Sequence, residues 1–265
     1  MIAFPNIDPT AFNIFGIAIQ WYGIAYAIGL LLGLFYSKYL IKNNNIKKEF
    51  FDDLILWITL GIIFGGRLGY VVFYDLSFYI KNLSLVFLDI RKGGMSFHGG
   101  LLGVITSTYI FCKIKKLHFL KFMDIISCAA PIGIFLGRIT NFINSELWGK
   151  TTSLPWGVVF PNGGLTPRHP TQIYEAFLEG IVLFLILNYF YRKKYFIEGY
   201  CASIFLILYG VFRVLIEFVR VPDEHIGYLL GNFLTNGILL SLPMILLGCI
   251  IFLKVNDKYR KNIKK

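Results

Sequence analysis

Residues 54–74 read LILWITLGIIFGGRLGYVVFY, and this stretch decides the fold because Arg67 is its only charged residue. A helix needs about 20 mostly apolar residues to cross the hydrocarbon core of a bilayer, which is roughly 30 Å thick. Residues 54–74 meet that requirement, and further stretches have a similar composition. The sequence therefore predicts seven transmembrane spans, at residues 14–37, 54–74, 97–112, 122–142, 174–191, 201–219 and 237–253.

The composition of the whole chain also indicates a membrane protein. Of 265 residues, 56% are hydrophobic and 15% are charged, and the mean hydropathy is +0.65, whereas a soluble domain carries roughly 25% charged residues. These values exclude a disordered chain, a disulfide scaffold and an ordinary soluble enzyme. No Lys or Arg precedes Lys38, so the first span lacks the basic region of a cleavable signal and is expected to be retained. We expect an all-α polytopic membrane protein in which residues 1–265 form a single domain.

The distribution of basic residues predicts which side of the membrane each loop occupies. Seventeen of the 26 Lys and Arg residues lie in the loops after the first, third and fifth spans and in the C-terminal tail, six lie on the opposite side, and three lie within spans. Short loops rich in Lys and Arg stay in the cytoplasm. The N-terminus is therefore expected to be extracytoplasmic and the C-terminus cytoplasmic, with a small extracytoplasmic head built from the outer loops.

The three basic residues within spans are Arg67, Arg138 and Arg213. A charge inside a bilayer costs roughly 2.5–3.5 kcal/mol or more. With the predicted topology, all three lie about 18–24 Å from the cytoplasmic edge of the helix and so in the outer half of the membrane. Each could snorkel to the surface or pair with a carboxylate to hold the helices together. Three at one depth favour an anionic ligand such as a phospholipid headgroup, because a guanidinium binds phosphate through a planar fork and stays charged.

These arginines differ in their local partners. Glu217 lies four residues after Arg213, and Tyr209 four residues before it, so the three form one polar stripe on a helix. Neither Arg67 nor Arg138 has an acidic residue three or four positions away. The sequence therefore predicts an ion pair along its own helix only for Arg213.

Four more polar residues are expected on the same outer side. His98, at the mouth of the third span, could act as a general base near neutral pH or simply bond a loop carbonyl. Tyr22 lies in the outer part of the first span, where an interfacial aromatic is also common. Asn141 and Glu146 are costly in contact with lipid and are expected to face the bundle interior.

The sequence is compatible with two roles for each of two further segments. The glycines of GGRLGY at residues 65–70 could allow close helix packing or serve the site around Arg67. The segment LTPRHPTQIYE at residues 165–175 contains Arg168, His169, Gln172 and Glu175. Its prolines make this segment a rigid loop that leads into the fifth span. The segment could have a structural or a functional role, and the sequence favours neither.

Six motifs of the chain resemble the bacterial prolipoprotein diacylglyceryl transferase family, and together they cover nearly its whole length. The fourth of them is similar to the family signature, apart from Thr140, where the family normally has Gly or Ala. The motifs are WYG at Trp21–Gly23, GGRLGY at Gly65–Tyr70, MSFHGG at Met95–Gly100, GRITNFINSELWG at Gly137–Gly149, RHPTQIYE at Arg168–Glu175 and YGVFRVLIEFVRVPD at Tyr209–Asp223.

The resemblance implies an enzyme of the bacterial plasma (inner) membrane whose active site faces outward. Its implied substrates are phosphatidylglycerol and prolipoprotein signal peptides that carry a lipobox cysteine, and its implied product is a thioether. No metal, cofactor or nucleic acid is expected, and membrane lipids are the other partners. The implied catalytic residues are Tyr22, His98, Asn141 and Arg213. The residues expected to bind substrate are Arg67, Arg138, Glu146, Tyr209 and Glu217.

Three other functions were compared with this one. A transporter or flippase for anionic lipids would need charged groups that continue into the inner half of the spans, where only Asp124, Glu179 and Glu198 are expected. An intramembrane protease would need a productive pair such as Ser96 and His98, but residues so close on one turn rarely face each other. A non-catalytic scaffold would leave the gathering of polar residues unexplained.

Overall fold

The computed structural model describes residues 2–5, 7–42, 46–88, 94–193, 197–222, 227–231 and 234–263. Among these residues, seven helical segments are long and apolar enough to cross a membrane, which confirms the predicted all-α membrane fold. They are Trp21–Leu40, Glu49–Tyr74, Phe97–Lys115, Phe119–Ile143, Thr171–Arg192, Tyr200–Glu217 and Asn236–Lys261. Some residues used above for topology or motifs lie outside the described residues, namely Arg91, Lys92, Lys194, Asp223, Lys264 and Lys265.

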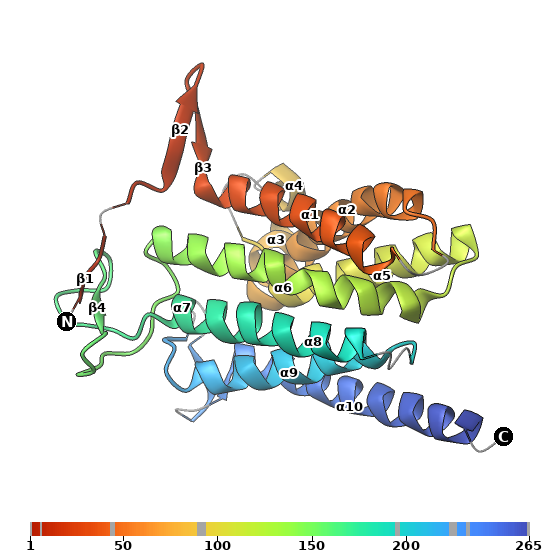
Figure 1. The fold of residues 1–265 in the computed structure, drawn as a ribbon. Helices are drawn as coiled ribbons and strands as arrows, with labels where there is room; N and C mark the ends of the chain where they lie inside the picture. Colours follow the sequence, from red (N-terminus) through yellow and green to blue (C-terminus); the bar gives the residue numbers. More distant parts are fainter. Residues whose placement is uncertain are drawn as a thin grey trace. The chain divides into compact units, whose positions relative to one another are not determined.

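The predicted start of the first span is wrong. Helix α1 (Trp21–Leu40) begins at Trp21, and the residues before it form an antiparallel hairpin of β2 (Thr10–Ile14) and β3 (Ile17–Gln20) (Figure 1). The turn is made by Phe15 and Gly16, whose φ angles of 49° and 81° lie in the left-handed region. Apolar β-branched residues favour strands as readily as they fill a membrane helix, so apolarity alone could not separate the two.

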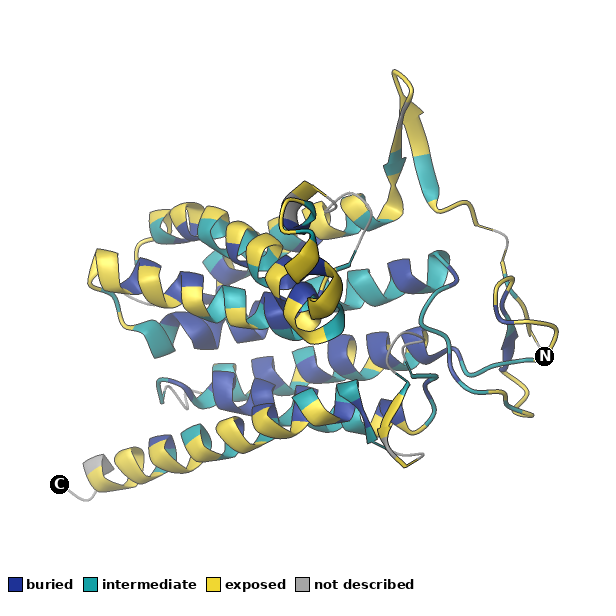
Figure 2. Cartoon of the chain, turned by 180° about the vertical axis from the view of Figure 1, so that it is seen from behind, coloured by how far each residue is buried: buried dark blue, intermediate teal, exposed yellow. Residues whose placement is uncertain are grey.

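The chain divides into two compact units, residues 37–125 and the remainder, and each is described by itself. In the larger unit, the fifth span consists of α7 (Thr171–Glu175), the π-helix η2 (Ala176–Val182) and α8 (Leu183–Arg192). Next along the chain, α9 (Tyr200–Glu217) packs against α10 (Asn236–Ile263). The α10 helix, which leads to the C-terminus in Figure 2, is exposed along much of its length, and most of its exposed large apolar side chains are leucines. Such a surface suits contact with lipid.

The connection between α6 (Phe119–Ile143) and α7 folds back on itself through backbone pairing. Thr151 and Val158 both bridge to Arg168, and Gly149 bridges to Arg220 just beyond α9. A short parallel pair joins β1 (Ile2–Ala3) to β4 (Val158–Val159). A third pair, β5 (Tyr228–Leu230) with β6 (Leu234–Thr235), precedes α10. The sequence predicted a head made of loops but none of these ladders.

The smaller unit is built on close packing between α2 (Glu49–Tyr74) and α5 (Phe97–Lys115). A Cβ atom at Gly65 would lie 2.7 Å from the Cα of Gly103, and one at Gly69 would lie 3.1 Å from the amide nitrogen of Gly99. These backbones approach too closely for larger residues. The packing interpretation of the GGRLGY glycines is therefore confirmed. Two short helices, α3 (Leu76–Lys81) and α4 (Leu85–Leu88), follow α2.

Candidate functional site

An ion-pair network of three arginines and three glutamates lies in the larger unit. From α6, Arg138 donates to Glu179 Oε2 through Nε at 3.1 Å and through Nη2 at 2.8 Å. Its Nη1 lies 3.2 Å from Glu175 Oε2, and its Nη2 lies 3.4 Å from the Tyr209 hydroxyl. The guanidinium of Arg138 is thus oriented by side chains from two other helical segments.

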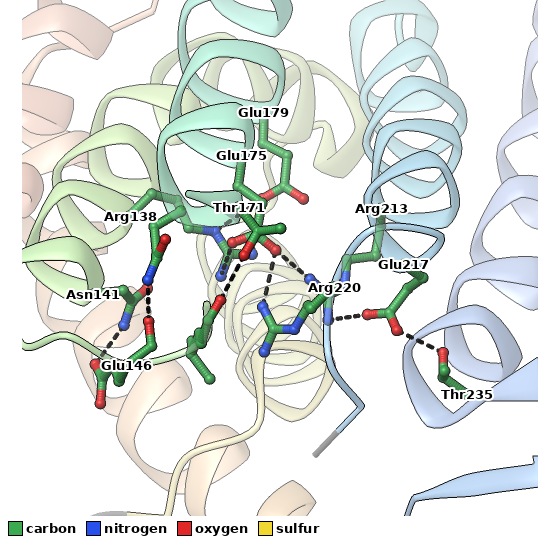
Figure 3. Close-up of polar contacts among 12 residues, drawn as sticks. Arg138, Asn141, Glu146, Thr171, Glu175, Glu179, Arg213, Glu217, Arg220 and Thr235 are labelled. Carbon is green, nitrogen blue, oxygen red and sulfur yellow. Dashed lines mark hydrogen bonds and ion pairs between the residues drawn. The ribbon is translucent and has the colours of Figure 1, made fainter. Parts of the chain in front are cut away.

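Glu175, the last residue of α7, lies at the centre of this network (Figure 3). Its Oε1 accepts hydrogen bonds from Arg213 and, at 3.0 Å, from Nη1 of Arg220. The side chains of Glu175 and Glu179 are 0% exposed, whereas those of Arg138 and Arg213 are 14% and 11% exposed. The two arginines are therefore partly accessible, whereas the two carboxylates are fully buried.

Glu217 anchors the other side of Arg213. Its Oε1 forms an ion pair with Arg213 Nη2, and its Oε2 accepts a hydrogen bond of 2.7 Å from Thr235. The Thr235 hydroxyl oxygen in turn accepts from the backbone N–H of Ile238, so it also caps the start of α10. Gly237 leaves room for this arrangement, because a Cβ atom there would lie 2.7 Å from Glu217 Cδ.

A second group of hydrogen bonds surrounds Asn141. Its Nδ2 donates to Glu146 Oε1 at 2.7 Å and lies 3.4 Å from the Tyr22 hydroxyl. The residues on either side of Glu146, Ser145 and Leu147, have φ angles of 53° and 59°. Left-handed conformations of non-glycine residues cost on the order of 1–3 kcal/mol and persist where the surroundings fix them. These two backbone conformations reverse the direction of the chain and bring the Glu146 carboxylate to Asn141.

Helix α7 connects the two groups. Gln172 donates to the backbone oxygen of Glu146 at 2.5 Å, and Thr171 donates to that of Leu147 at 2.7 Å. One turn later, Glu175 binds the arginines. The π-helix η2 begins directly after Glu175, and π-helical turns are rare and often mark functional sites.

The smaller unit contains the other two predicted site residues. Arg67 is 1% exposed, and its guanidinium donates to the backbone oxygens of Val86 at 2.5 Å and Gly94 at 3.2 Å, and to the Tyr79 hydroxyl at 3.0 Å. These contacts fasten the segment that contains α3 and α4, so they favour a structural role over substrate binding.

His98 lies in the first turn of α5, and its ring meets that of Phe97 edge-on at 5.6 Å. The helix is capped by Ser96, whose side chain accepts from the N–H of Gly99 at 3.2 Å. The Ser96 side chain therefore caps the N-terminus of α5. This role gives no support to the interpretation of Ser96 and His98 as a protease pair.

The structure brings together most residues that the sequence singled out. Arg138, Tyr209, Arg213 and Glu217 form the ion-pair network, and Tyr22, Asn141 and Glu146 form the hydrogen-bonded group. Their catalytic and binding roles stay predictions. Thr140, the departure from the family pattern, is accommodated because its hydroxyl donates to the Leu136 carbonyl at 2.9 Å.

Glu179, Arg220 and the neighbouring Thr235 were not assigned to the site from the sequence, and Glu175 was named only within a segment whose role stayed open. Helical spacing within α6 could not reveal the partners of Arg138, because both of its carboxylates come from the fifth span. Glu179 was expected near the cytoplasmic edge. That placement is wrong, because a residue in contact with Arg138 lies at the depth of Arg138. The four-residue spacing of Glu175 and Glu179, on one helical face, was the signal that could have found them.

This arrangement can stabilise negative charge on a ligand. The guanidiniums are fixed before any ligand arrives, and preorganised donors of this kind are more effective in a low-dielectric site than in water. Three arginines balance three glutamates, so the network is formally neutral without a ligand. Outside the spans, burial lowers the pKa of His169, whose Nδ1 lies 3.3 Å from the Tyr174 hydroxyl.

Comparisons with known proteins agree with the resemblance. A protein of Rickettsia felis named phosphatidylglycerol–prolipoprotein diacylglyceryl transferase is 48% identical over 261 residues, which cover 97% of this chain and 100% of the relative. Proteins with the same name from Brucella anthropi and Brucella canis are each 43% identical, over 93% and 98% of this chain and 91% and 96% of the relatives. The profile of the family described as prolipoprotein diacylglyceryl transferase matches residues 9–254. The chain therefore belongs to the prolipoprotein diacylglyceryl transferase family.

Proposed function

We propose that this chain transfers the diacylglyceryl group of phosphatidylglycerol to the lipobox cysteine of prolipoprotein signal peptides, the first step of lipoprotein maturation. Family membership supports the reaction, since the relatives carry the name of this transferase. The observation that supports the site is the pair of arginines, Arg138 and Arg213, which are partly exposed and backed by buried carboxylates. Such a pair suits the phosphate of a lipid headgroup.

The chemistry needs a base and a stabiliser of negative charge. A free thiol has a pKa near 8.5 and is mostly protonated at neutral pH. In the proposed step, the cysteine sulfur loses its proton and attacks the glyceryl carbon next to the phosphate. The carbon–sulfur bond forms, the carbon–oxygen bond breaks, and glycerol phosphate leaves with the electron pair.

Arg138 and Arg213 stabilise the charge that develops on the leaving phosphate. Loss of one comparable donor in other enzymes costs on the order of 3–4 kcal/mol. We propose His98 as the acceptor of the thiol proton, with Tyr22, Glu217 and a phosphate oxygen as the alternatives. Asn141, Glu146 and Tyr209 orient these groups, and Arg67 supports the fold of the smaller unit.

An in vitro assay tests the reaction. Purified protein, phosphatidylglycerol and a lipobox peptide are expected to give a peptide with the mass of one diacylglyceryl group added, together with glycerol phosphate. A peptide in which serine replaces the lipobox cysteine is the control and should stay unmodified. Absence of both products, with folded protein and intact substrates, would refute the proposed function.

We propose that the protein resides in the bacterial plasma membrane with the site facing outward, because most basic residues lie in the loops assigned to the cytoplasm. A reporter fused after Lys265 should behave as cytoplasmic, and one inserted near Lys81 as extracytoplasmic. The opposite pattern would contradict this orientation. Nothing in the structure or among the relatives favours the transporter alternative.

A further inference from the structure

We propose that Glu175 is a positioning residue that holds Arg138 and Arg213 together as one phosphate cradle. This inference rests on the proposed function, in which both arginines act on the headgroup. Glu175 is not among the residues that the sequence assigned to catalysis or binding. It is the one glutamate, among those the structure describes, that contacts all three arginines of the network.

Glu175 lies between like charges. Two guanidiniums that must grip one phosphate repel each other when no ligand is present, and the repulsion is strong in a low-dielectric interior. Glu175 offers one oxygen to Arg138 and the other to Arg213 and Arg220. Its carboxylate therefore reduces the repulsion between Arg138 and Arg213, because it is a partner of both. Glu179 and Glu217 do not do this, because each is paired with a single arginine.

Glu175 is less accessible than the arginines that it contacts. Its side chain is 0% exposed, its carboxylate lies between the guanidiniums in Figure 3, and the side chains of Arg138 and Arg213 are 14% and 11% exposed, so an incoming lipid would meet the arginines first. A carboxylate in that place acts through the arginines and does not touch the reacting atoms. Its role is therefore to orient them.

Helix α7 holds Glu175 rigidly in place. Thr171 and Gln172, in the same short helix, hydrogen-bond the strained turn that carries Glu146. Glu175 is thus fixed to the frame that also orients Asn141. A displacement of about 1 Å at such a support can lower turnover on the order of 100-fold.

The key variant is Glu175→Gln, which keeps the shape of the side chain and removes its charge. We expect kcat for peptide diacylglycerylation to fall on the order of 100-fold, while KM for phosphatidylglycerol changes much less, because the guanidiniums that attract the headgroup remain. Glu179→Gln is the matched comparison on the next helical turn and should lower kcat less, since it releases only Arg138. Equal kcat for Glu175→Gln and the wild-type protein would overturn the inference.

A second readout does not depend on turnover. Without the Glu175 charge, an external anion can take its place between the arginines, so inorganic phosphate should stabilise the Glu175→Gln protein in detergent. Saturating phosphate should raise the Tm of this variant by roughly 3–5 °C relative to sodium chloride of equal ionic strength. The wild-type protein should show a smaller shift. Equal shifts in both proteins would also overturn the inference.

The outcomes separate this inference from the proposed function. A wild-type protein that makes no thioether but is stabilised by phosphate, with a larger shift in Glu175→Gln, would refute the transferase reaction and retain the cradle. If Glu175→Gln does not fold, Glu175→Asp tests the same point, because it keeps the charge and shortens the side chain by one methylene. We expect Glu175→Asp to have a near-normal Tm and a reduced kcat, whereas a role in charge balance alone would leave kcat unchanged.

Discussion

Substitution of Gly237 by alanine should impair the site without removing any charged group. A Cβ atom at Gly237 would lie 2.7 Å from Glu217 Cδ and 3.2 Å from Arg213 Nη2. Carbon atoms in ordinary contact are about 3.5–4.0 Å apart, so the Glu217 carboxylate must move by roughly 1 Å. A misplacement of that size near a reacting group can cost on the order of 100-fold in rate, which corresponds to about 2.7 kcal/mol of transition-state stabilisation.

The assay is initial-rate transfer to a lipobox peptide, normalised to folded protein. Alanine favours a helix over glycine by up to about 1 kcal/mol, so an effect on α10 alone would stabilise the protein and leave activity intact. The control is Gly33→Ala in α1, where a Cβ atom meets nothing within 4 Å. Combination of Gly237→Ala with Glu217→Asp should recover part of the activity, because the shorter side chain withdraws from the new methyl group. Full activity in Gly237→Ala would refute the reasoning.

The remaining predictions concern three residues with different roles. Arg138→Lys should lower kcat/KM at least on the order of 100-fold, because an ammonium cannot reproduce a bidentate phosphate contact, and near-normal turnover in the peptide assay would argue against the headgroup role. Arg67→Gln should lower the free energy of unfolding by roughly 3 kcal/mol through lost charged hydrogen bonds, seen as a lower Tm in detergent; reduced activity at an unchanged Tm would contradict a structural role. Because burial lowers the pKa of His169, its unfolded state binds a proton more readily, so stability is full above about pH 6.5 and decreases as the pH falls below it. The His169→Gln variant should lose less stability at low pH than the wild-type protein. An identical pH profile of Tm in the two proteins would contradict this role of His169.

The spans could be predicted because their cause is local in the sequence. About 20 consecutive apolar residues are sufficient for a membrane helix whatever surrounds them, and the third predicted span begins at the observed residue, Phe97. The start of the first span could not be predicted in this way. There the left-handed turn at Phe15 and Gly16 converts apolar residues into a hairpin, and composition does not distinguish the two.

Only part of the candidate site could be predicted from the sequence. The sequence by itself determined that Arg138 and Arg213 lie within membrane spans, and that Glu217 accompanies Arg213, because helical spacing fixes neighbours on one helix. The tertiary structure decided that Arg138 pairs with Glu175 and Glu179 from the fifth span. It also decided that Arg67 is held by backbone oxygens of its own unit. A buried charge takes whichever partner the fold brings within a few ångströms, and that choice depends on contacts between distant residues that no local pattern records.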